Sequence, residues 1–294
     1  MFAPICLFTY NRPKETLRTL QALKANSLAK DSRLFIFSDG PKKNSLADVE
    51  KVRELIEDVN GFKSVEVYLS QVNKGLSHSI IDGVSTIIEQ FGKVIVLEDD
   101  LITSPNFLNF MNQALDFYSS ENKIFSISGY SLDLPSLKDY PKDWYLGYRA
   151  SSWGWGTWQN RWKEVDWEVK DFKKFKRNPF GQYQFMRGGS DLPWMLYKQM
   201  NGKIDSWAIR WCYNQFKNDQ YTVFPSQSKV ISIGFGEAAS NTKKTTRFDT
   251  CLDTTQKSIF YFEKKPKMDT KLNKEFKNKF SLINRIKNRL LQFM

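Results

Sequence analysis

Apolar residues in the first half of the chain fall into two alternating patterns. Short runs rich in β-branched residues have the length and composition of buried strands, and they predict strands at residues 3–8, 33–37, 65–69 and 93–97. Between these runs, apolar residues recur every three or four positions, which predicts helices from residue 13 and over 46–59 and 76–88. Alternation of this kind is typical of a parallel sheet with helices on both faces. The pattern therefore predicts an α/β fold.

Start signals sharpen the expected position of two helices. Pro13 opens the first helix, whose apolar face is expected to carry Leu17, Leu20 and Leu23. Ser104 and Pro105 supply an N-cap and a first turn for a helix after the fourth strand. One more strand is predicted at residues 124–128.

Each predicted strand in this half ends in a polar loop, at residues 9–12, 38–40, 71–75 and 98–100. Right-handed crossovers would bring these four loops to one edge of the sheet. The fourth loop carries three carboxylates, Glu98, Asp99 and Asp100. Open α/β sheets bind ligands at this edge, and hard oxygen ligands suit Mg²⁺ or Mn²⁺ carrying a phosphorylated substrate. The alternative is an ordinary solvated acidic loop.

The second half of the chain has a different composition. All nine tryptophans lie between residues 144 and 211, in a stretch with fewer helical periods and several Gly, Ser and Pro residues. This composition predicts a second, more irregular lobe. Most of the tryptophans are expected in the core, whereas two or three beside a polar cleft would stack on sugar faces.

Positive charge is concentrated at the C-terminus. The chain has a net charge of +12, and residues 264–294 hold ten Lys or Arg against two acidic residues. The body is therefore only mildly basic, and because it carries no fingerprint of a nucleic-acid module, we expect no nucleic-acid partner. Apolar residues at 276, 280, 283, 286, 290 and 294 predict a basic amphipathic helix. It would either pack on the body or lie on an anionic membrane surface.

Cysteine usage and hydropathy indicate the compartment. The three cysteines lie far apart and give neither a disulfide framework nor a zinc cluster, which favours a reducing compartment. No apolar run approaches the ~20 residues of a membrane-spanning helix, and the first residues lack the charged segment of a signal peptide. We expect a cytoplasmic protein, peripheral on the inner membrane face if its tail binds lipid. With 294 residues and 41% hydrophobic content, the chain can bury one large core or two smaller ones.

Several motifs resemble those of GT-A glycosyltransferases. Residues Pro4-Ile-Cys-Leu-Phe-Thr-Tyr-Asn-Arg-Pro13 resemble the nucleotide-binding start of family-two enzymes, and Asn73-Lys-Gly-Leu-Ser77 resembles their Asn-x-Gly loop. Glu98-Asp-Asp100, followed by Ser104-Pro-Asn-Phe107, is most similar to the acidic motif of the N-acetylglucosaminyltransferase I group. The resemblance covers residues 3–242. It implies a GT-A sheet with a nucleotide-sugar half at 1–130, an acceptor and catalytic half at 131–262, and the basic tail at 263–294.

The resemblance also implies roles for single residues on the donor side. Asp100 would hold the divalent ion, Mn²⁺ or Mg²⁺, while Glu98 and Asp99 would orient it or contact the donor ribose or sugar. Asp39 would bind the base, and Lys74 would approach the base or the diphosphate. The other residues implied to line the donor are Thr9, Asn11, Arg12 and Arg149.

On the acceptor side, the resemblance places the catalytic base on Asp205, with Trp207 able to stack on the acceptor. The loop from Pro225 would close over the donor, and it ends at Ser240 or Asn241, where the family often has a histidine.

The chemistry can be argued from the residues alone. A sugar leaving a nucleoside diphosphate develops negative charge that a divalent ion stabilises, and a carboxylate can take the proton from the incoming hydroxyl. Because His78 is the only histidine, a carboxylate is the favoured base. Asp191 is the rival of Asp205, although an Asx turn ahead of Pro193 would explain it. A helix N-cap is the alternative role for Asp205.

These observations predict an inverting, metal-dependent glycosyltransferase, a hexosyl- or N-acetylhexosaminyltransferase of polysaccharide biosynthesis. It would move sugar from a nucleotide-sugar donor to a glycan or a lipid-linked saccharide. One alternative, a sugar-phosphate nucleotidyltransferase, would need a Gly-rich phosphate loop, and residues 9–13 contain no glycine. The other alternative is a non-catalytic carbohydrate-binding protein. The sequence does not indicate the donor sugar, the acceptor or the linkage.

Overall fold

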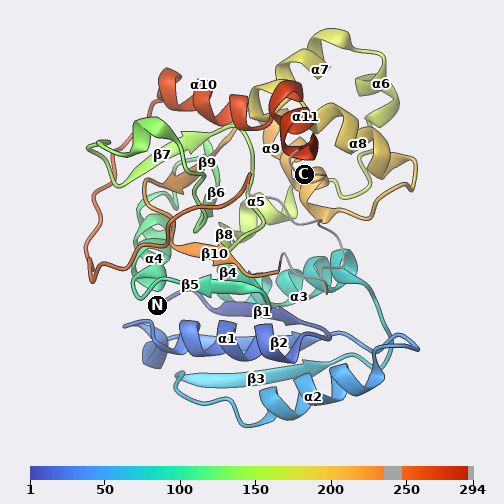
Figure 1. The fold of residues 1–294 in the computed structure, drawn as a ribbon, viewed down its shortest axis with the longest axis vertical. Helices are drawn as coiled ribbons and strands as arrows, with labels where there is room; N and C mark the ends of the chain where they lie inside the picture. The colour runs from blue at the N-terminus through green and yellow to red at the C-terminus, as the bar shows by residue number, and fades with distance from the viewer. Residues whose placement is uncertain (235–246, 291–294) are drawn as a thin grey trace.

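One eight-stranded sheet runs through the protein, with helices on both faces (Figure 1). The computed structural model describes residues 1–234 and 247–290, with side chains in the second stretch as far as residue 286. The strand order is β3-β2-β1-β4-β8-β6-β9-β7, in which β3, β2, β1 and β4 are parallel. The predicted α/β fold class is confirmed. The strands of the sheet are β1 (Ile5–Thr9), β2 (Arg33–Ser38), β3 (Ser64–Leu69), β4 (Lys93–Glu98), β6 (Ile124–Ser128), β7 (Trp144–Gly147), β8 (Trp155–Trp158) and β9 (Tyr221–Pro225).

Helices connect these strands and cover them. The α-helices are α1 (Pro13–Lys24), α2 (Leu46–Glu57), α3 (Leu76–Phe91), α4 (Phe107–Phe117), α5 (Gln159–Lys163), α6 (Phe172–Lys176), α7 (Pro179–Phe185), α8 (Leu192–Met200), α9 (Trp207–Lys217), α10 (Thr270–Lys279) and α11 (Leu282–Leu290). Three short 3₁₀ turns are η1 (Ala29–Asp31), η2 (Pro135–Leu137) and η3 (Met186–Gly188). A small second sheet pairs β5 (Leu101–Thr103) with β10 (Val230–Ser232) in antiparallel fashion.

The core is divided between the two faces of the large sheet. Successive strand residues point to opposite faces, so in β1 Ile5 and Leu7 join one cluster while Cys6 and Phe8 join the other. The first cluster packs under α1, α2, α4 and α10, and the second packs under α3 and α5 to α9. Burial on both faces explains why these strands are continuously apolar.

Two helices differ from prediction in detail. Leu17 is 43% exposed, because α1 turns Thr16 and Thr19 inward beside Leu20 and Leu23. The Thr19 hydroxyl donates to the carbonyl of Asp99 (2.8 Å), which ties α1 to the loop after β4. The N-cap of α4 is Asn106 instead of Ser104. Strand β5, which begins directly after Asp100, was not predicted.

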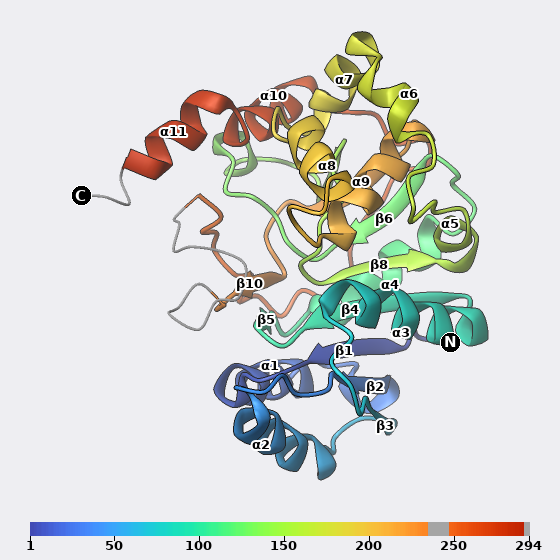
Figure 2. The ribbon, with the colours of Figure 1, turned by 90° about the vertical axis from the view of Figure 1, so that its right-hand side faces the viewer.

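The second half of the chain, predicted to be the more irregular one, also contributes strands to the main sheet. Strands β6 to β9 extend the sheet of the first half, and β8 lies antiparallel between β4 and β6. Gly156 makes this insertion feasible, since an added Cβ would lie 2.9 Å from the carbonyl oxygen of Val94. The irregular part includes the short helices α5 to α8, seen from the top to the right of Figure 2, and the loops between the strands.

The basic tail forms two helices instead of the single helix predicted. The first, α10, packs on the body through Leu272 and Phe276, and Phe280 just beyond it is also buried. The second, α11, follows a break at Ser281 and projects from the body (Figures 1 and 2). Among the described residues, no helix is long and apolar enough to cross a membrane.

Candidate active site

The four loops predicted to share one edge of the sheet are joined there by hydrogen bonds. The carboxylate of Asp39 accepts from the backbone N–H groups of Lys74 (2.8 Å) and Gly75 (2.9 Å), which links the second loop to the third. The N–H of Asp39 donates to the carbonyl of Thr9 (3.1 Å), which adds the first loop. The N–H of Tyr10 donates to the carboxylate of Asp99 (3.2 Å), which adds the fourth.

The three carboxylates after β4 form a crowded group that we call the acidic tip (Glu98, Asp99 and Asp100). Burial, reinforced by the charges of Asp100 and Asp99, raises the pKa of Glu98 to about 8. Burial also raises the pKa of Asp99 to about 7, although the charge of Arg12 opposes the shift. One nitrogen of Arg12 lies 2.6 Å from Asp100 and 3.7 Å from Asp99. The acidic tip therefore holds more negative charge than the guanidinium of Arg12 balances.

The acidic tip offers hard ligands but no complete metal cage. Carboxylate oxygens suit Mg²⁺ and Mn²⁺, which at phosphate sites take one or two carboxylates and complete their shell with phosphate and water. In residues 1–234 and 247–290, no three or more His, Cys, Asp or Glu side chains form a metal-binding group. The residues therefore fit an ion that binds together with a phosphorylated ligand, with Asp100 as the more accessible of the two aspartates in contact with Arg12.

A cavity of about 630 Å³ begins at the acidic tip and extends under the C-terminal helices. Glu98, Leu76 and Asp205 line it on the side of the strand ends. Aromatic side chains line it on the other side, among them Trp153, Phe248, Phe276 and Phe280. Carboxylates beside aromatic rings are the wall composition that saccharide-binding clefts use.

Asp205 lies on the loop before α9, at the wall of this cavity. Its side chain is 58% exposed, with Arg210 at 3.9 Å. The alternative role of Asp205 as an N-cap is wrong, because the hydroxyl of Ser206 caps α9 by accepting from the N–H of Ile209 (3.4 Å). Asp205 also faces the third loop, since a Cβ added to Gly75 would lie 3.9 Å from its carboxylate.

The expected stacking role of Trp207 is wrong. Its ring is 3% exposed and packs on Trp155, with 5.1 Å between the ring centroids, inside a cluster that also contains Trp162 and Trp211. Helix α9 turns both of its tryptophans into the core because they lie four positions apart on one face. Trp153 is the partly exposed tryptophan at the cavity.

Arg149 and Asp191 form a buried pair in the cavity wall. The two guanidinium nitrogens donate to the two carboxylate oxygens at 2.9 and 3.2 Å, and the guanidinium stacks over Phe280 with 4.1 Å to the ring centroid. Both side chains are largely shielded from solvent, at 16% and 8% exposure. The explanation of Asp191 as an Asx turn is wrong, because its oxygens bind this arginine.

The other residues expected around the donor lie on the joined loops. Thr9 is buried and its hydroxyl donates to the carbonyl of Phe37 (3.3 Å). Asn11 is partly exposed on the first loop. The ammonium group of Lys74 lies 3.3 Å from Asp82, at 45% exposure. The roles expected for them stay predictions, and Ser240 and Asn241 lie outside the described residues.

No sequence motif pointed to Gly234 as a neighbour of the acidic tip. The N–H of Ile233 donates to the carbonyl of Asp100 (2.8 Å), and a Cβ added to Gly234 would overlap the carboxylate of Asp100. The backbone after β10 therefore closes directly over Asp100. Only glycine at position 234 permits this approach.

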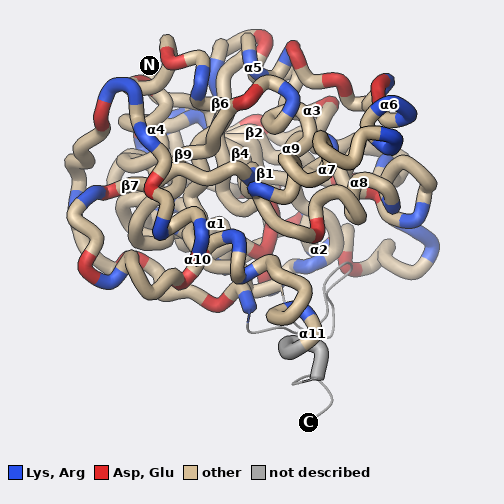
Figure 3. Tube along the Cα trace, turned by 90° about the horizontal axis from the view of Figure 1, so that it is seen from above, with Lys and Arg blue, Asp and Glu red and all other residues tan. Residues whose placement is uncertain are grey.

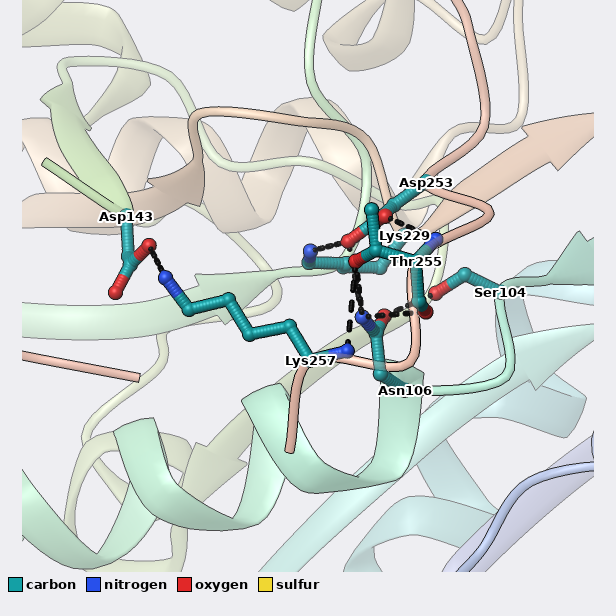
Figure 4. A network of polar contacts seen from close by, with 7 residues as sticks. All are labelled: Ser104, Asn106, Asp143, Lys229, Asp253, Thr255 and Lys257. Atoms are coloured by element: carbon teal, nitrogen blue, oxygen red, sulfur yellow. Dashed lines mark hydrogen bonds and ion pairs between the residues drawn. The ribbon is translucent and has the colours of Figure 1, made fainter. Parts of the chain in front are cut away.

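A second unpredicted feature fixes both ends of the segment between β10 and residue 253. We call it the clamp (Lys229, Asp253, Asn106 and Thr255), and Figure 4 shows it. Lys229 and Asp253 form an ion pair and are 3% and 1% exposed. The amide of Asn106 donates to Asp253 (2.9 Å), as does the N–H of Thr255 (2.8 Å). Nothing in the local sequence distinguishes Lys229 from a solvated lysine.

Comparison with known proteins identifies the family. The sequence model of glycosyl transferase family 2 matches residues 5–189, more than half of the chain. The chain belongs to this family. No curated protein matches the chain.

Solved structures with similarity to this chain include three glycosyltransferases. S. aureus TarS matches with 11% identity and a TM-score of 0.44, over 79% of this chain and 36% of the TarS chain. A mannosyltransferase from Pyrobaculum calidifontis, solved with GDP-Man and Mn²⁺, matches with 8% identity and a TM-score of 0.40, over 74% of this chain and 70% of that one. The galactosyltransferase LgtC matches with 11% identity and a TM-score of 0.37, over 72% and 70%. This chain thus spans about a third of the TarS chain.

Proposed function

We propose that this family-two protein is an inverting, divalent-metal-dependent transferase that moves a sugar from a nucleotide-sugar to a saccharide acceptor. The observation that carries the proposal is the cavity that joins the acidic tip to Asp205. Glu98 of the acidic tip and Asp205 line one side of this cavity, and aromatic side chains line the other. The four strand-end loops are hydrogen-bonded to one another beside the acidic tip. We also propose that, within the family, the protein is most similar to the N-acetylglucosaminyltransferase I group.

On the donor side, the joined loops bind the nucleotide and hold its diphosphate beside Asp100. A divalent ion held by Asp100 would stabilise the negative charge that develops on the departing diphosphate. Glu98 and Asp99 orient that site, and Arg12 provides a cation for the diphosphate oxygens. Asp39 shapes the base pocket by holding the third loop in place through its backbone N–H groups.

On the acceptor side, Asp205 accepts the proton of the attacking hydroxyl. Its exposure and its place at the cavity wall make it available to an incoming group, whereas Asp191 is already bound to Arg149. Attack on the anomeric carbon from the side opposite the diphosphate inverts its configuration. Trp153 and Phe248 offer ring faces to the acceptor sugar, which is a glycan or a lipid-linked saccharide.

A donor panel tests this proposal. Purified protein is mixed with UDP-, GDP- and TDP-sugars in Mn²⁺ or in EDTA, and release of nucleoside diphosphate is measured with a saccharide acceptor. We expect release from one donor class in Mn²⁺, an inverted product, and no release in EDTA. A retained anomeric configuration would exclude Asp205 as a simple base. Full activity in EDTA would exclude the metal role of Asp100.

We also propose that α11 rests on an anionic membrane at the inner face, beside a lipid-linked acceptor. Leu282, Ile283 and Ile286 are 60%, 78% and 50% exposed, while Phe280, once expected to contact lipid, is buried in the body. Figure 3 shows Lys and Arg distributed along the described chain. Each basic residue near an anionic surface contributes about 1 kcal/mol.

Sedimentation with anionic liposomes tests the membrane proposal. Because α10 is part of the core, the informative change is Ile283→Asp with Ile286→Asp instead of deletion of the whole tail. This double variant should no longer sediment with the liposomes. The control Ile259→Asp, at a residue on the body that is 61% exposed, should sediment like the parent. If the parent protein never sediments, α11 does not bind membranes.

A further inference from the structure

Arg12 occupies the position beside Asp100 that a cation ligated by Asp100 would need. Its nitrogen donates to one carboxylate oxygen of Asp100 at 2.6 Å, within ordinary range for a charge-assisted hydrogen bond. The two side chains are only 18% and 16% exposed, so the contact is shielded from solvent.

The start of α1 fixes the backbone position of Arg12. Pro13 occupies the first turn, and the carbonyl of Arg12 accepts from the N–H (2.9 Å) and the hydroxyl (2.7 Å) of Thr16. The backbone of Arg12 therefore cannot move without loss of the helix start. Its side chain, in contrast, can adopt other staggered rotamers without a change in this backbone.

The backbone after β10 closes the ion pair from the other side. A Cβ on Gly234 would overlap the carboxylate of Asp100 and would lie 3.1 Å from the nitrogen of Arg12. The same carboxylate oxygen of Asp100 is thus enclosed between a guanidinium and a backbone segment. Little room remains for a hydrated ion while Arg12 holds this rotamer.

We propose that Arg12 and the divalent ion bind Asp100 alternately, and that the diphosphate of the donor shifts the exchange toward the ion. The proposal rests on the function proposed above. Without nucleotide, Arg12 neutralises part of the acidic tip and excludes the ion. A bound diphosphate offers the guanidinium a bidentate anionic partner, so Arg12 turns to it and releases Asp100. Arg12 is then a positioning residue that makes ion binding dependent on the nucleotide.

Mn²⁺ binding to the full chain measures this exchange without any turnover. Free Mn²⁺ is titrated by electron paramagnetic resonance for the parent and for Arg12→Gln, with and without UDP or GDP. In Arg12→Gln the charge-assisted hydrogen bond from Arg12 to Asp100 no longer competes with the ion. The variant should therefore bind Mn²⁺ about 10- to 100-fold more tightly without nucleotide. The affinity gain on adding nucleotide should be large in the parent and small in the variant.

Two further variants separate local exchange from general charge. Arg18→Gln removes an equal charge from an exposed position on α1, and it should change Mn²⁺ affinity less than about threefold. Arg12→Lys keeps the charge and loses the forked geometry, so it should give an intermediate affinity, and it serves if Arg12→Gln does not fold.

Equal Mn²⁺ affinity of the parent and Arg12→Gln without nucleotide would overturn the exchange while the transferase proposal stands. Failure of every protein to bind Mn²⁺ even with nucleotide, together with sugar transfer in EDTA, would instead remove the metal role from the proposed function. The two failures are therefore distinguishable.

Discussion

Two groups of buried charges near the segment that begins with β10 differ in balance: the clamp pairs Lys229 with Asp253, and the acidic tip lies against Gly234. In the clamp, one lysine meets one aspartate, the amide of Asn106 donates to the same carboxylate oxygen as the lysine, and the N–H of Thr255 donates to the other oxygen. In the acidic tip, three carboxylates share one arginine, and burial, with the neighbouring carboxylates adding to it, raises the pKa of Glu98 and of Asp99. Removing one partner of a balanced buried pair is costly because the other charge is left uncompensated, whereas carboxyl groups with perturbed pKa values cluster at functional sites.

The largest expected effect is at Asp205, an exposed carboxylate that lines the same cavity as Glu98. Its substitution should change turnover and leave stability unchanged. Asp205→Asn should lower turnover about 10²- to 10⁴-fold, because a general base is lost. Its melting temperature should stay near that of the parent, since Ser206 supplies the cap of α9. Asp48→Asn, at 51% exposure on α2, is the matched control and should leave turnover unchanged. Near-normal transfer by Asp205→Asn would reassign the base.

The clamp should show the opposite behaviour. Lys229→Met leaves Asp253 buried without its cation and should cost about 3–5 kcal/mol of unfolding free energy, on the order of 10 °C in melting temperature. Adding Asp253→Asn to this variant should restore part of the loss, because no buried charge remains. Lys257→Met breaks the more exposed pair with Asp143 and should cost about 1 kcal/mol or less. A denaturant series on the four proteins measures the effect, and additive losses would contradict the pairing.

The acidic tip should also appear in the pH dependence of stability. Glu98 and Asp99 have folded pKa values of about 8 and about 7, above those of unfolded carboxyl groups. The folded state therefore binds more protons, and this stabilisation is complete below the unfolded pKa values and lost as pH rises through the folded ones. Without divalent ions, the melting temperature should fall by a few degrees from pH 6 to pH 8. The chain has a single histidine, so histidine titration contributes little to the change in this range. Glu98→Gln should flatten the fall, and an unchanged slope would contradict the assignment.

The regular half of the fold and the place of the acidic tip follow from the sequence, because both depend on local patterns. Apolar runs define β1 to β4. Because these strands are parallel, the polar residues that follow them all lie at the same edge of the sheet. The path of β8 between β4 and β6 was not predictable, because antiparallel insertion depends on contacts far apart in sequence, such as Gly156 against Val94. The burial of Lys229 could not be predicted either. Its partner Asp253 lies 24 residues away, and no period or motif connects the two.

One paired measurement tests the contrast between the two charge groups most directly. Nucleoside diphosphate release in Mn²⁺ and melting temperature are recorded for Asp100→Asn and Asp253→Asn in parallel with the parent. Asp100→Asn should lose about 10²-fold or more in turnover, since several kcal/mol of charge stabilisation disappear, and it should melt at or above the parent temperature. Asp253→Asn should melt several degrees lower, with turnover per folded molecule within about threefold of the parent. If Asp100→Asn unfolds early and keeps its turnover while Asp253→Asn is stable and inactive, the assignment of the acidic tip to function and of the clamp to stability is wrong.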